Sequence, residues 1–344
     1  MRKVLVPADI DPALPPAGSA MMDAAGRTMG TNWSARMMVP AGVRSNLAEQ
    51  MQRELDGIVA EMSHWDAESI LGRYNRAPEG SWHALPPRFV EVLDYALAVA
   101  GASGGAYDPF AGELVNLWGF GPSGRHDEAG FNPPSPDAVE AALALRAGRH
   151  PQFDRAAGSL RQPGGLQLDL SSVAKGYAVD RLAWCLEQHG VRHYVVEIGG
   201  ELRGAGVKAD GQPWWVELEM PAMAPGPDML PTVVALHGLS VATSGDYRRH
   251  YRRHDGRHFS RGEIHASHTI DPRSGYPIAN DIASCTVLHP SCMAADALST
   301  AITVLGADAG LAFAEERQLA ARLLLRRGGS LEERATSAWD ALLQ

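Results

Sequence analysis

The segment 167–180, QLDLSSVAKGYAVD, gathers polar groups where an apolar stretch meets a helix. We predict that Asp169 ends a strand and that Ser171 or Ser172 caps the next helix, which carries Lys175 near its start. Free amides at a helix N-terminus and a lysine both favour phosphate, so this junction suits a diphosphate or a ribose. The pattern fits equally well an ordinary capped helix whose lysine faces solvent.

A second pair of oxygen-bearing side chains, Asp296 and Thr300, lies within a helix expected at 293–305. Their spacing of four residues places both on one face of that helix. Oxygen ligands presented together suit a hard cation such as Mg²⁺, which takes few protein ligands and completes its shell with water and substrate phosphate. The alternative is structural, because Asp complements the helix dipole and a mid-helix Thr often bonds the carbonyl four residues back.

The segment 268–277, HTIDPRSGYP, contains two tight-turn signals that would expose His268 and Asp271 at a loop edge. A histidine there could accept a proton from an incoming hydroxyl at neutral pH. Asp271 could instead simply bond its own turn.

Clustered histidines also raise the possibility of zinc. The candidates are His250, His254, His258, His265 and His268. Zinc is the weaker interpretation, because Asp255-Gly256 interrupts any helix that would align three of them and no cysteine joins the set. The same Asp-Gly pair lies between two strand-like pieces and predicts a hairpin.

The bulk composition excludes several classes of protein. A formal charge of −9 disfavours a nucleic-acid groove, and the basic stretch 248–253 is short. The motifs GxxxxGK[ST], HExxH, GxSxG and a helix-opening GxGxxG are absent, so a nucleotide would be held in another way. Three cysteines without CxxC spacing predict packing residues rather than disulfides or a zinc site.

No apolar run is long enough to span a membrane, and the basic start Met1-Arg2-Lys3 is not followed by the apolar core of a signal peptide. We therefore expect a cytoplasmic protein, with a periplasmic one as the alternative if a leader is missing. The chain of 344 residues, 45% of them hydrophobic, predicts one domain over 21–344, possibly with two lobes and the active site between them. Residues 1–20, with four prolines, predict an extended arm that adds little to the core.

The elements that must position these groups follow from periodicity and turn signals. Helices are predicted at 46–62 behind a Ser45 cap, from Pro87 to the glycines at 101–105, from Ser135-Pro136 to Gly148, at 173–190, at 293–305 and at 308–318. Strands are predicted at 193–198, 214–219, 232–237, 284–289 and 323–325. Strands paired mainly by hairpins with helices grouped around them predict an α+β fold.

Six ordered blocks resemble the ApbE family of FAD:protein FMN transferases over residues 27–307. They are 29–31 (MGT), 62–75 (MSHW, then ES and RYN), 106–121 (AYDP, then LWGFG), 169–180, 243–247 (TSGDY) with 268–277, and 295–300 (ADALST). The resemblance implies a T-fold-like, two-lobed architecture with a mainly antiparallel sheet and flanking helices. It also implies an enzyme that uses FAD as substrate and Mg²⁺ as cofactor.

The resemblance assigns roles position by position. Flavin and nucleotide contacts are implied for Met29, Trp65, Ala106, Tyr107, Asp108, Asp169, Lys175 and Ile270. Metal ligands are implied at Ser172, through its backbone carbonyl, and at Asp296 and Thr300, with Ser299 where some members place a carboxylate for a second ion. One departure is Phe110, which replaces a small polar residue of the family pattern.

The expected reaction transfers the FMN half of FAD to a Ser or Thr hydroxyl of an acceptor flavoprotein and releases AMP. The hydroxyl would be deprotonated by His268 or by a carboxylate near the metal, and His268 and Asp296 are the predicted catalytic residues. A Mg²⁺-dependent FAD diphosphatase would need the same site, with water in place of the hydroxyl. A non-enzymatic FAD carrier is a further alternative, but storage alone requires no metal at the scissile bond.

Overall fold

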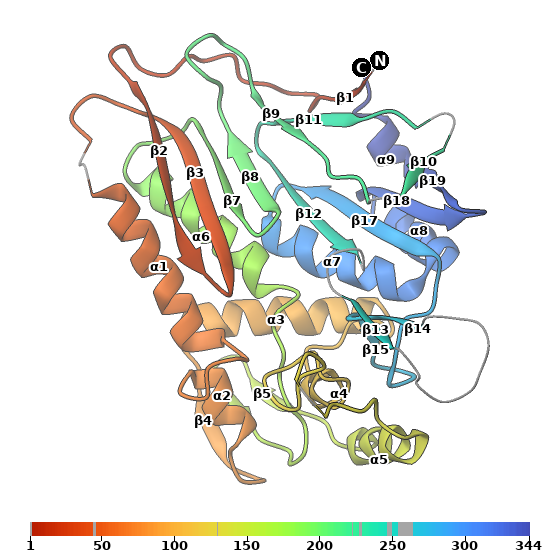
Figure 1. Ribbon diagram of the computed structural model, residues 1–344. Coiled ribbons are helices and arrows are strands. Elements are labelled where there is room, and N and C mark those ends of the chain that lie inside the picture. The colour runs from red at the N-terminus through yellow and green to blue at the C-terminus, as the bar shows by residue number, and fades with distance from the viewer. Residues whose placement is uncertain are drawn as a thin grey trace.

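The computed structural model describes residues 2–43, 46–128, 130–221, 223–226, 229–245, 250–253 and 264–344. One large sheet crosses the upper part of the molecule, with helices gathered on one of its faces (Figure 1). In the described chain nine strands form it, in the order β10-β19-β18-β17-β12-β8-β7-β3-β2. All neighbours pair antiparallel except β10 with β19, so the predicted α+β class is confirmed. The strands are β2 (Ala20–Thr28), β3 (Thr31–Val39), β7 (Tyr194–Ile198), β8 (Glu201–Ala205), β10 (Ala224–Pro225), β12 (Leu239–Gly245), β17 (Ile282–His289), β18 (Ala320–Arg327) and β19 (Ser330–Ala335).

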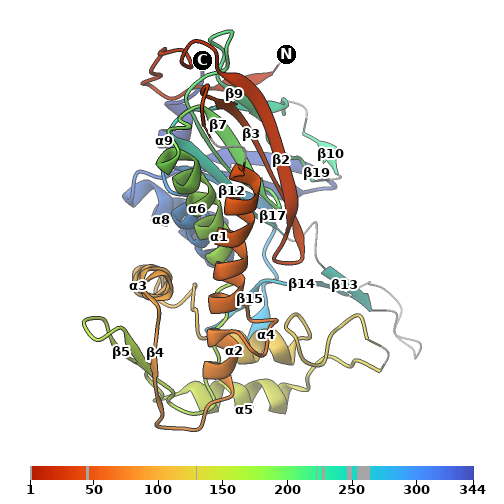
Figure 2. The ribbon, with the colours of Figure 1, turned by 90° about the vertical axis from the view of Figure 1, so that its left-hand side faces the viewer.

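The main hydrophobic core lies between this sheet and its helices. The helices are α1 (Leu47–Met62), α6 (Ala174–Gln188), α7 (Cys292–Leu305) and α8 (Ala307–Glu316), with α3 (Pro87–Ala102) packed below α7 (Figure 1). Figure 2 shows α1 and α6 side by side. Apolar residues at helical spacing, such as Leu47, Met51 and Leu55 on α1, are fully buried there. Burial of this periodic face holds the helices at fixed positions on the sheet.

A smaller core covers the opposite face of the sheet. It is formed with β1 (Lys3–Leu5), β9 (Trp214–Glu217), β11 (Thr232–Leu236) and α9 (Ser337–Asp340). β1 pairs parallel with β11, and Leu5 is fully buried. The expectation that the N-terminal arm adds little to the core is therefore wrong at Leu5, because strand pairing brings this residue inside.

Shorter elements lie below the sheet and its helices in Figure 1. They are α2 (Ile70–Asn75), α4 (Gly112–Leu117), α5 (Pro136–Arg146), β4 (Trp82–Ala84), β5 (Gln152–Asp154), β6 (Ser159–Arg161), β13 (His250–Arg253), β14 (Ile264–Ser267), β15 (Ile270–Asp271) and β16 (Tyr276–Pro277). β13 and β14 pair antiparallel, while Asp255-Gly256 lies outside the described residues. The division into an arm and one domain stays a prediction.

The six predicted helices are all present, with small changes at their ends. Ser135 accepts a hydrogen bond from the Ala138 amide and Pro136 is the first helical residue, as predicted for α5. α1 begins at Leu47, and its predicted cap Ser45 lies outside the described residues.

The strand predicted to end at Asp169 is absent from the described chain. Residue 167 forms only an isolated bridge with Ala111. The backbone of Leu168 bonds a side chain instead of a strand, since its amide donates to Asn75 Oδ1 (2.7 Å) and its carbonyl accepts from Asn75 Nδ2 (2.8 Å). The predicted Ser171 or Ser172 cap is also wrong, because the residue before α6 is Val173 and no side chain caps it.

The β2–β3 hairpin was not predicted from the sequence. Its two-residue turn consists of Met29 (φ 47°) and Gly30 (φ 72°), with Thr28 paired to Thr31. Two consecutive positive φ values match the turns that favour Asn-Gly, so Met-Gly gave no turn signal. The turn places Met29 beside the cavity described next.

Candidate functional site

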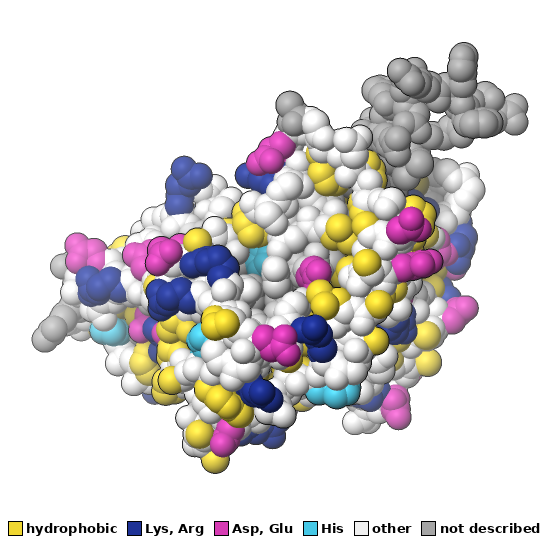
Figure 3. Space-filling view, turned by 90° about the horizontal axis from the view of Figure 1, so that it is seen from below, with side chains coloured by type: hydrophobic (Ala, Val, Ile, Leu, Met, Phe, Trp, Pro, Cys, Tyr) yellow, Lys and Arg dark blue, Asp and Glu magenta, His cyan; other side chains and the backbone are white. Residues whose placement is uncertain are grey.

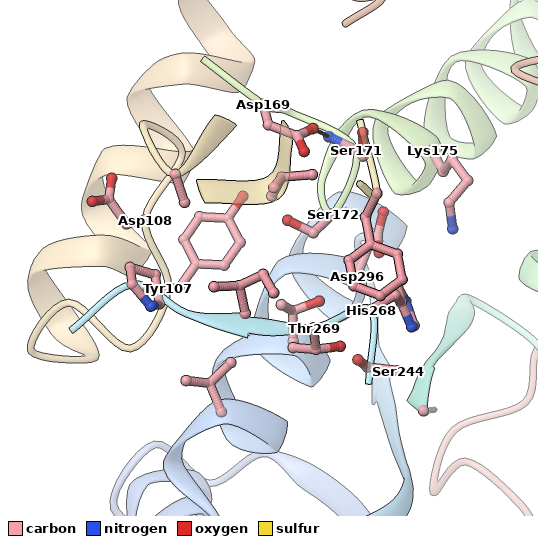
Figure 4. A pocket seen from close by; sticks show the side chains of 18 of the residues that line it. Tyr107, Asp108, Asp169, Ser171, Ser172, Lys175, Ser244, His268, Thr269 and Asp296 are labelled. Carbon is pink, nitrogen blue, oxygen red and sulfur yellow. Dashed lines mark hydrogen bonds between the residues drawn. The ribbon is translucent and has the colours of Figure 1, made fainter. Parts of the chain in front are cut away.

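A cavity of about 350 Å³ brings together twelve of the thirteen residues predicted to contact FAD, hold a metal or act in catalysis. They are Met29, Trp65, Ala106, Tyr107, Asp108, Asp169, Ser172, Lys175, His268, Ile270, Asp296 and Thr300. Their elements are far apart in the chain but meet below the sheet, where α6, α7, the β2–β3 turn and the shorter elements converge (Figure 1). Figure 4 shows Ser172, Asp296 and His268 close together, with Tyr107 and Asp108 on one side and Lys175 on the other.

The oxygen-bearing residues Asp296 and Thr300 both line the cavity, as their spacing on α7 predicted. Asp296 is only 5% exposed, and one of its oxygens accepts the Gly176 amide of α6 at 2.9 Å. Burial raises the pKa of Asp296 to about 7, nearby Lys175 lowers it, and Glu201 raises it further.

These residues fit a hard cation. Ser172, in the turn just before α6, joins Asp296 and Thr300 of α7 at the cavity, so carboxylate, hydroxyl and carbonyl oxygens are available together. A buried carboxylate whose charged form is penalised gains most from a neighbouring cation. Among the described residues, no group of three or more His, Cys, Asp or Glu could hold a metal ion.

Ser299 is the one singled-out residue that the structure does not place at the cavity. Its side chain is 1% exposed and donates to the Asp296 carbonyl oxygen at 2.9 Å. Its own carbonyl accepts from Thr303 Oγ1 at 2.7 Å. Its side chain therefore bonds within α7, and the second metal site implied for it stays a prediction.

Lys175 does not simply face solvent. Its ammonium group bonds Glu201 Oε1, and the side chains of Lys175 and Glu201 are 31% and 6% exposed. Glu201, the first residue of β8, also lines the cavity but was missed in the sequence. The available signal was a lone carboxylate opening an apolar strand just after Gly199-Gly200.

Asp108 and Asp169 are both fixed by neighbouring groups. Arg146 on α5 bonds the Asp108 carboxylate and the Phe110 carbonyl. Asp169 Oδ1 accepts the Ser171 amide at 2.8 Å. Asp108 Oδ1 also accepts the Phe110 amide at 2.8 Å, so both of its oxygens are already bonded. Asp169 has only Oδ1 bonded among the described residues, which leaves Oδ2 for a hydroxyl-bearing ligand such as a ribose.

Tyr107 and Phe110 are both buried, but only Tyr107 lines the cavity. Burial raises the pKa of the Tyr107 hydroxyl, which remains protonated beside Ser172 and can donate a hydrogen bond. The Phe110 side chain packs into the main core instead. Phe110, which departs from the family pattern, therefore lies behind the cavity wall and does not line the cavity.

A second cavity of about 740 Å³ adjoins the first and shares Met29, Trp65, Lys175 and His268 with it. Trp65 is half exposed, with the Arg125 guanidinium 5.7 Å from its ring centroid. A large, flat indole surface between two joined cavities suits a ring system that stacks on it.

His268 follows β14 and lines both cavities. Its ring lies 6.3 Å from that of Phe120, in an edge-on arrangement. Asp271 is held in its own turn, because it accepts the Arg273 amide at 2.9 Å and pairs with the Arg273 guanidinium. Of the two residues singled out in this turn, only His268 is therefore placed to act at the cavity.

The surroundings of the site add three findings. Seen from below, acidic, basic and apolar side chains of the described residues are mixed on this face (Figure 3).

No helix of the described chain is long and apolar enough to cross a membrane. Among the five histidines considered for zinc, His254 and His258 lie outside the described residues.

Comparisons with known proteins point to one family. The ApbE family model matches residues 29–323. The FAD:protein FMN transferase of Vibrio cholerae is 33% identical to this chain, in an alignment that covers 92% of this chain and 91% of the relative. That of Haemophilus influenzae is 34% identical, and the alignment covers 93% of this chain and 90% of the relative. The apo crystal structure of the Pseudomonas stutzeri flavinyl transferase ApbE is 36% identical, with a TM-score of 0.82 over 94% of this chain and 97% of its own. The chain therefore belongs to the ApbE family.

Proposed function

We propose that this protein is an FAD:protein FMN transferase that requires Mg²⁺ and attaches FMN to a Ser or Thr hydroxyl of an acceptor flavoprotein. The observation that carries the proposal is the shared cavity, where Ser172, Asp296 and Thr300 lie beside Lys175 and adjoin Trp65. Oxygens for a cation, an ammonium group for phosphate and an indole for a flat ring are the three contacts that bound FAD requires. The names of the relatives support the same activity.

In this reaction the acceptor oxygen forms a bond to the FMN phosphorus, the diphosphate bond to the bridging oxygen breaks, and AMP leaves with that oxygen. Mg²⁺ held by the Ser172 carbonyl, Asp296 and Thr300 would supply positive charge to the diphosphate. Lys175 adds a further positive charge to the same wall of the cavity.

His268 is the proposed base. It is the imidazole that lines both cavities, so it can reach a hydroxyl that enters beside the bound diphosphate. It would take the proton of the Ser or Thr hydroxyl as the new P–O bond forms. Asp169 would bind a hydroxyl at the other side, and Trp65 would retain the flavin ring.

The test is incubation with FAD, Mg²⁺ and an acceptor that contains a candidate Ser or Thr, with intact mass read for one FMN increment. The increment should require Mg²⁺ and disappear when the acceptor hydroxyl is removed. His268→Ala should slow transfer across the pH range, whereas His150→Ala, an exposed site remote from the cavity lining, should not.

Two results would contradict the proposal. Transfer that persists in EDTA would remove the metal from it. Rapid AMP release without an acceptor, and no mass increment with one, would identify an FAD diphosphatase instead.

A further inference from the structure

Glu201 has one carboxylate oxygen to which no described residue donates a hydrogen bond. The residue is 4% exposed and lines the cavity with Lys175 and Asp296. Oε1 bonds the Lys175 ammonium group. Oε2 is buried and has no hydrogen-bond partner among the described residues. A buried carboxylate oxygen without a donor is costly, so this arrangement indicates that a ligand supplies the donor.

A role as counter-ion for Lys175 explains why Oε1 is buried, but it does not explain why Oε2 is buried as well. A lysine has three donor protons and could be bonded by an acceptor that is not buried as deeply. Glu201 instead opens β8 directly after the Gly199-Gly200 turn, and its cross-strand partner is the fully buried Ile198. The sheet therefore holds the side chain at the cavity whether or not Lys175 is present.

The chemistry of the bound components limits which donor can meet Oε2. The diphosphate of FAD carries only acceptor oxygens at neutral pH, so it would repel this carboxylate. Mg²⁺ in proteins usually keeps several of its waters, and each bound water is a strong donor. Lys175 bonds Glu201, and the amide of the next residue, Gly176, donates to Asp296 at 2.9 Å, so both carboxylates meet the same turn of α6. This places Glu201 beside the proposed cation rather than at the adenosine end.

We infer that Glu201 is an outer-sphere ligand of the divalent cation, with Oε2 accepting a hydrogen bond from a water bound to it. This inference rests on the proposed function. Groups in this position orient the bound waters and strengthen metal binding, although they never touch the ion.

The formal charges of the group agree with this role. Two carboxylates, Glu201 and Asp296, and one ammonium group, Lys175, sum to −1 when all are ionised. A divalent cation changes that sum to +1, which is the sign that attracts a diphosphate. Without Glu201 the group would be neutral before the cation binds, and its attraction for the cation would be weaker.

The experiment measures cation binding directly, with Mn²⁺ as the probe because it takes the same oxygen ligands as Mg²⁺. Free Mn²⁺ is titrated by electron paramagnetic resonance in the presence of FAD, and Mg²⁺ competition confirms that the two ions share a site. Glu201→Gln keeps the shape but removes the charge. Glu201→Asp keeps the charge but withdraws the oxygens by one methylene. Glu197→Gln, on the opposite face of neighbouring β7 and outside the cavity lining, is the matched control.

Both Glu201 variants should bind Mn²⁺ about 10- to 100-fold more weakly than wild type, the range typical of outer-sphere partners. Glu197→Gln should bind it normally. FAD binding in EDTA, followed by flavin fluorescence, should change much less than Mn²⁺ binding in either Glu201 variant.

Three outcomes would overturn the inference. Unchanged Mn²⁺ affinity in both Glu201 variants would exclude any role with the cation. Normal affinity in Glu201→Asp with weak affinity in Glu201→Gln would leave only a long-range charge effect. Weaker FAD binding in EDTA with normal Mn²⁺ affinity would show that Glu201 acts only by positioning Lys175 for FAD. Failure of the proposed function is a separate result, since wild type itself would then neither bind Mn²⁺ nor transfer FMN.

Discussion

The amide of Gly176 on α6 donates a hydrogen bond to Asp296 Oδ2 on α7, at 2.9 Å. The two helices approach so closely at this point that a Cβ on residue 176 would lie 2.3 Å from the Cys292 carbonyl oxygen and 2.8 Å from Asp296 Cβ. The glycine therefore sets both the distance between the helices and the orientation of the buried carboxylate.

Gly176→Ala should destabilise the protein by about 1–3 kcal/mol, because the two helices must separate to admit the methyl group. It should also weaken Mn²⁺ binding by displacing Asp296. The matched control is Gly101→Ala on α3, where a Cβ meets nothing within 4 Å and the higher helix propensity of Ala should stabilise slightly. Urea unfolding and Mn²⁺ titration measure the two effects, and equal stability of the two variants would contradict the prediction.

Asp180 on α6 caps the first turn of α7 from outside that helix. Its carboxylate accepts from the amides of Cys292 and Met293, both at 3.0 Å, from Ser291 Oγ at 2.8 Å and from Arg203 at 2.6 Å. Asp180→Ala leaves these donors and the partly buried arginine without their acceptor, so we expect a loss of about 3 kcal/mol or more.

Asp308→Ala is the control for this substitution. Asp308 pairs with Arg334 but is 93% exposed, so its loss should change stability little. Urea unfolding of both variants measures the difference, and a small loss in Asp180→Ala would show that the start of α7 is held mainly by apolar packing.

Acid should destabilise the fold through two histidines. Burial lowers the pKa of His193 and of His289 from the usual value of 6.5, and each Nδ1 accepts a backbone amide. A lowered pKa means that the unfolded chain binds more protons than the folded one. This contribution to stability is therefore complete above pH 6.5 and is lost as pH falls below it toward the folded pKa values.

The measurement is the free energy of unfolding in urea from pH 7.5 to 5. Asp296, whose raised pKa makes the folded protein gain stability as pH falls through about 7, acts in the opposite direction, but equally in wild type and in these variants. His289→Gln, which can still offer an amide oxygen to Ser291, should therefore make the change in stability from pH 7.5 to 5 more favourable than in wild type. The exposed His150→Gln should leave that change as in wild type. The same pH dependence in His289→Gln and wild type would show that this histidine makes no contribution.

The three cysteines should resist thiol reagents in the native protein. Cys185, Cys285 and Cys292 are free and buried. Burial raises the pKa of Cys285 to about 12, and it raises the pKa of Cys185 and Cys292 above the usual value. Little reactive thiolate is therefore present at pH 8. A disulfide reagent should modify no cysteine in buffer and three in urea, and rapid native modification would contradict their burial.

Local spacing predicted those parts of the site that lie on one helix. Asp296 and Thr300 share a face of α7 because of the helical repeat, and this needed no knowledge of the rest of the fold. Glu201 could not be found in this way, since Lys175 lies 26 residues earlier on a different element. Only the packing of α6 against the sheet brings the two together.

The same contrast holds for the fold. Strands rich in β-branched or aromatic residues were predicted at 214–219 and 232–237 because their composition is distinctive, and the structure has them at 214–217 and 232–236. The segment at Leu168 was predicted as a strand because it is apolar, but Asn75 satisfies its backbone and no neighbouring strand is needed. Side-chain bonds of this kind have no sequence period, so local patterns cannot detect them.

At Met29, in the turn between β2 and β3, thermal stability and activity favour different residues. Met29 adopts a left-handed backbone conformation, with φ 47°, that asparagine or glycine would adopt more readily, yet its thioether forms part of the cavity wall. Engineering this chain for heat resistance by choosing the best turn former would select Asn at position 29. The resulting protein would tolerate higher temperatures and lose a soft, adaptable side chain from the cavity wall.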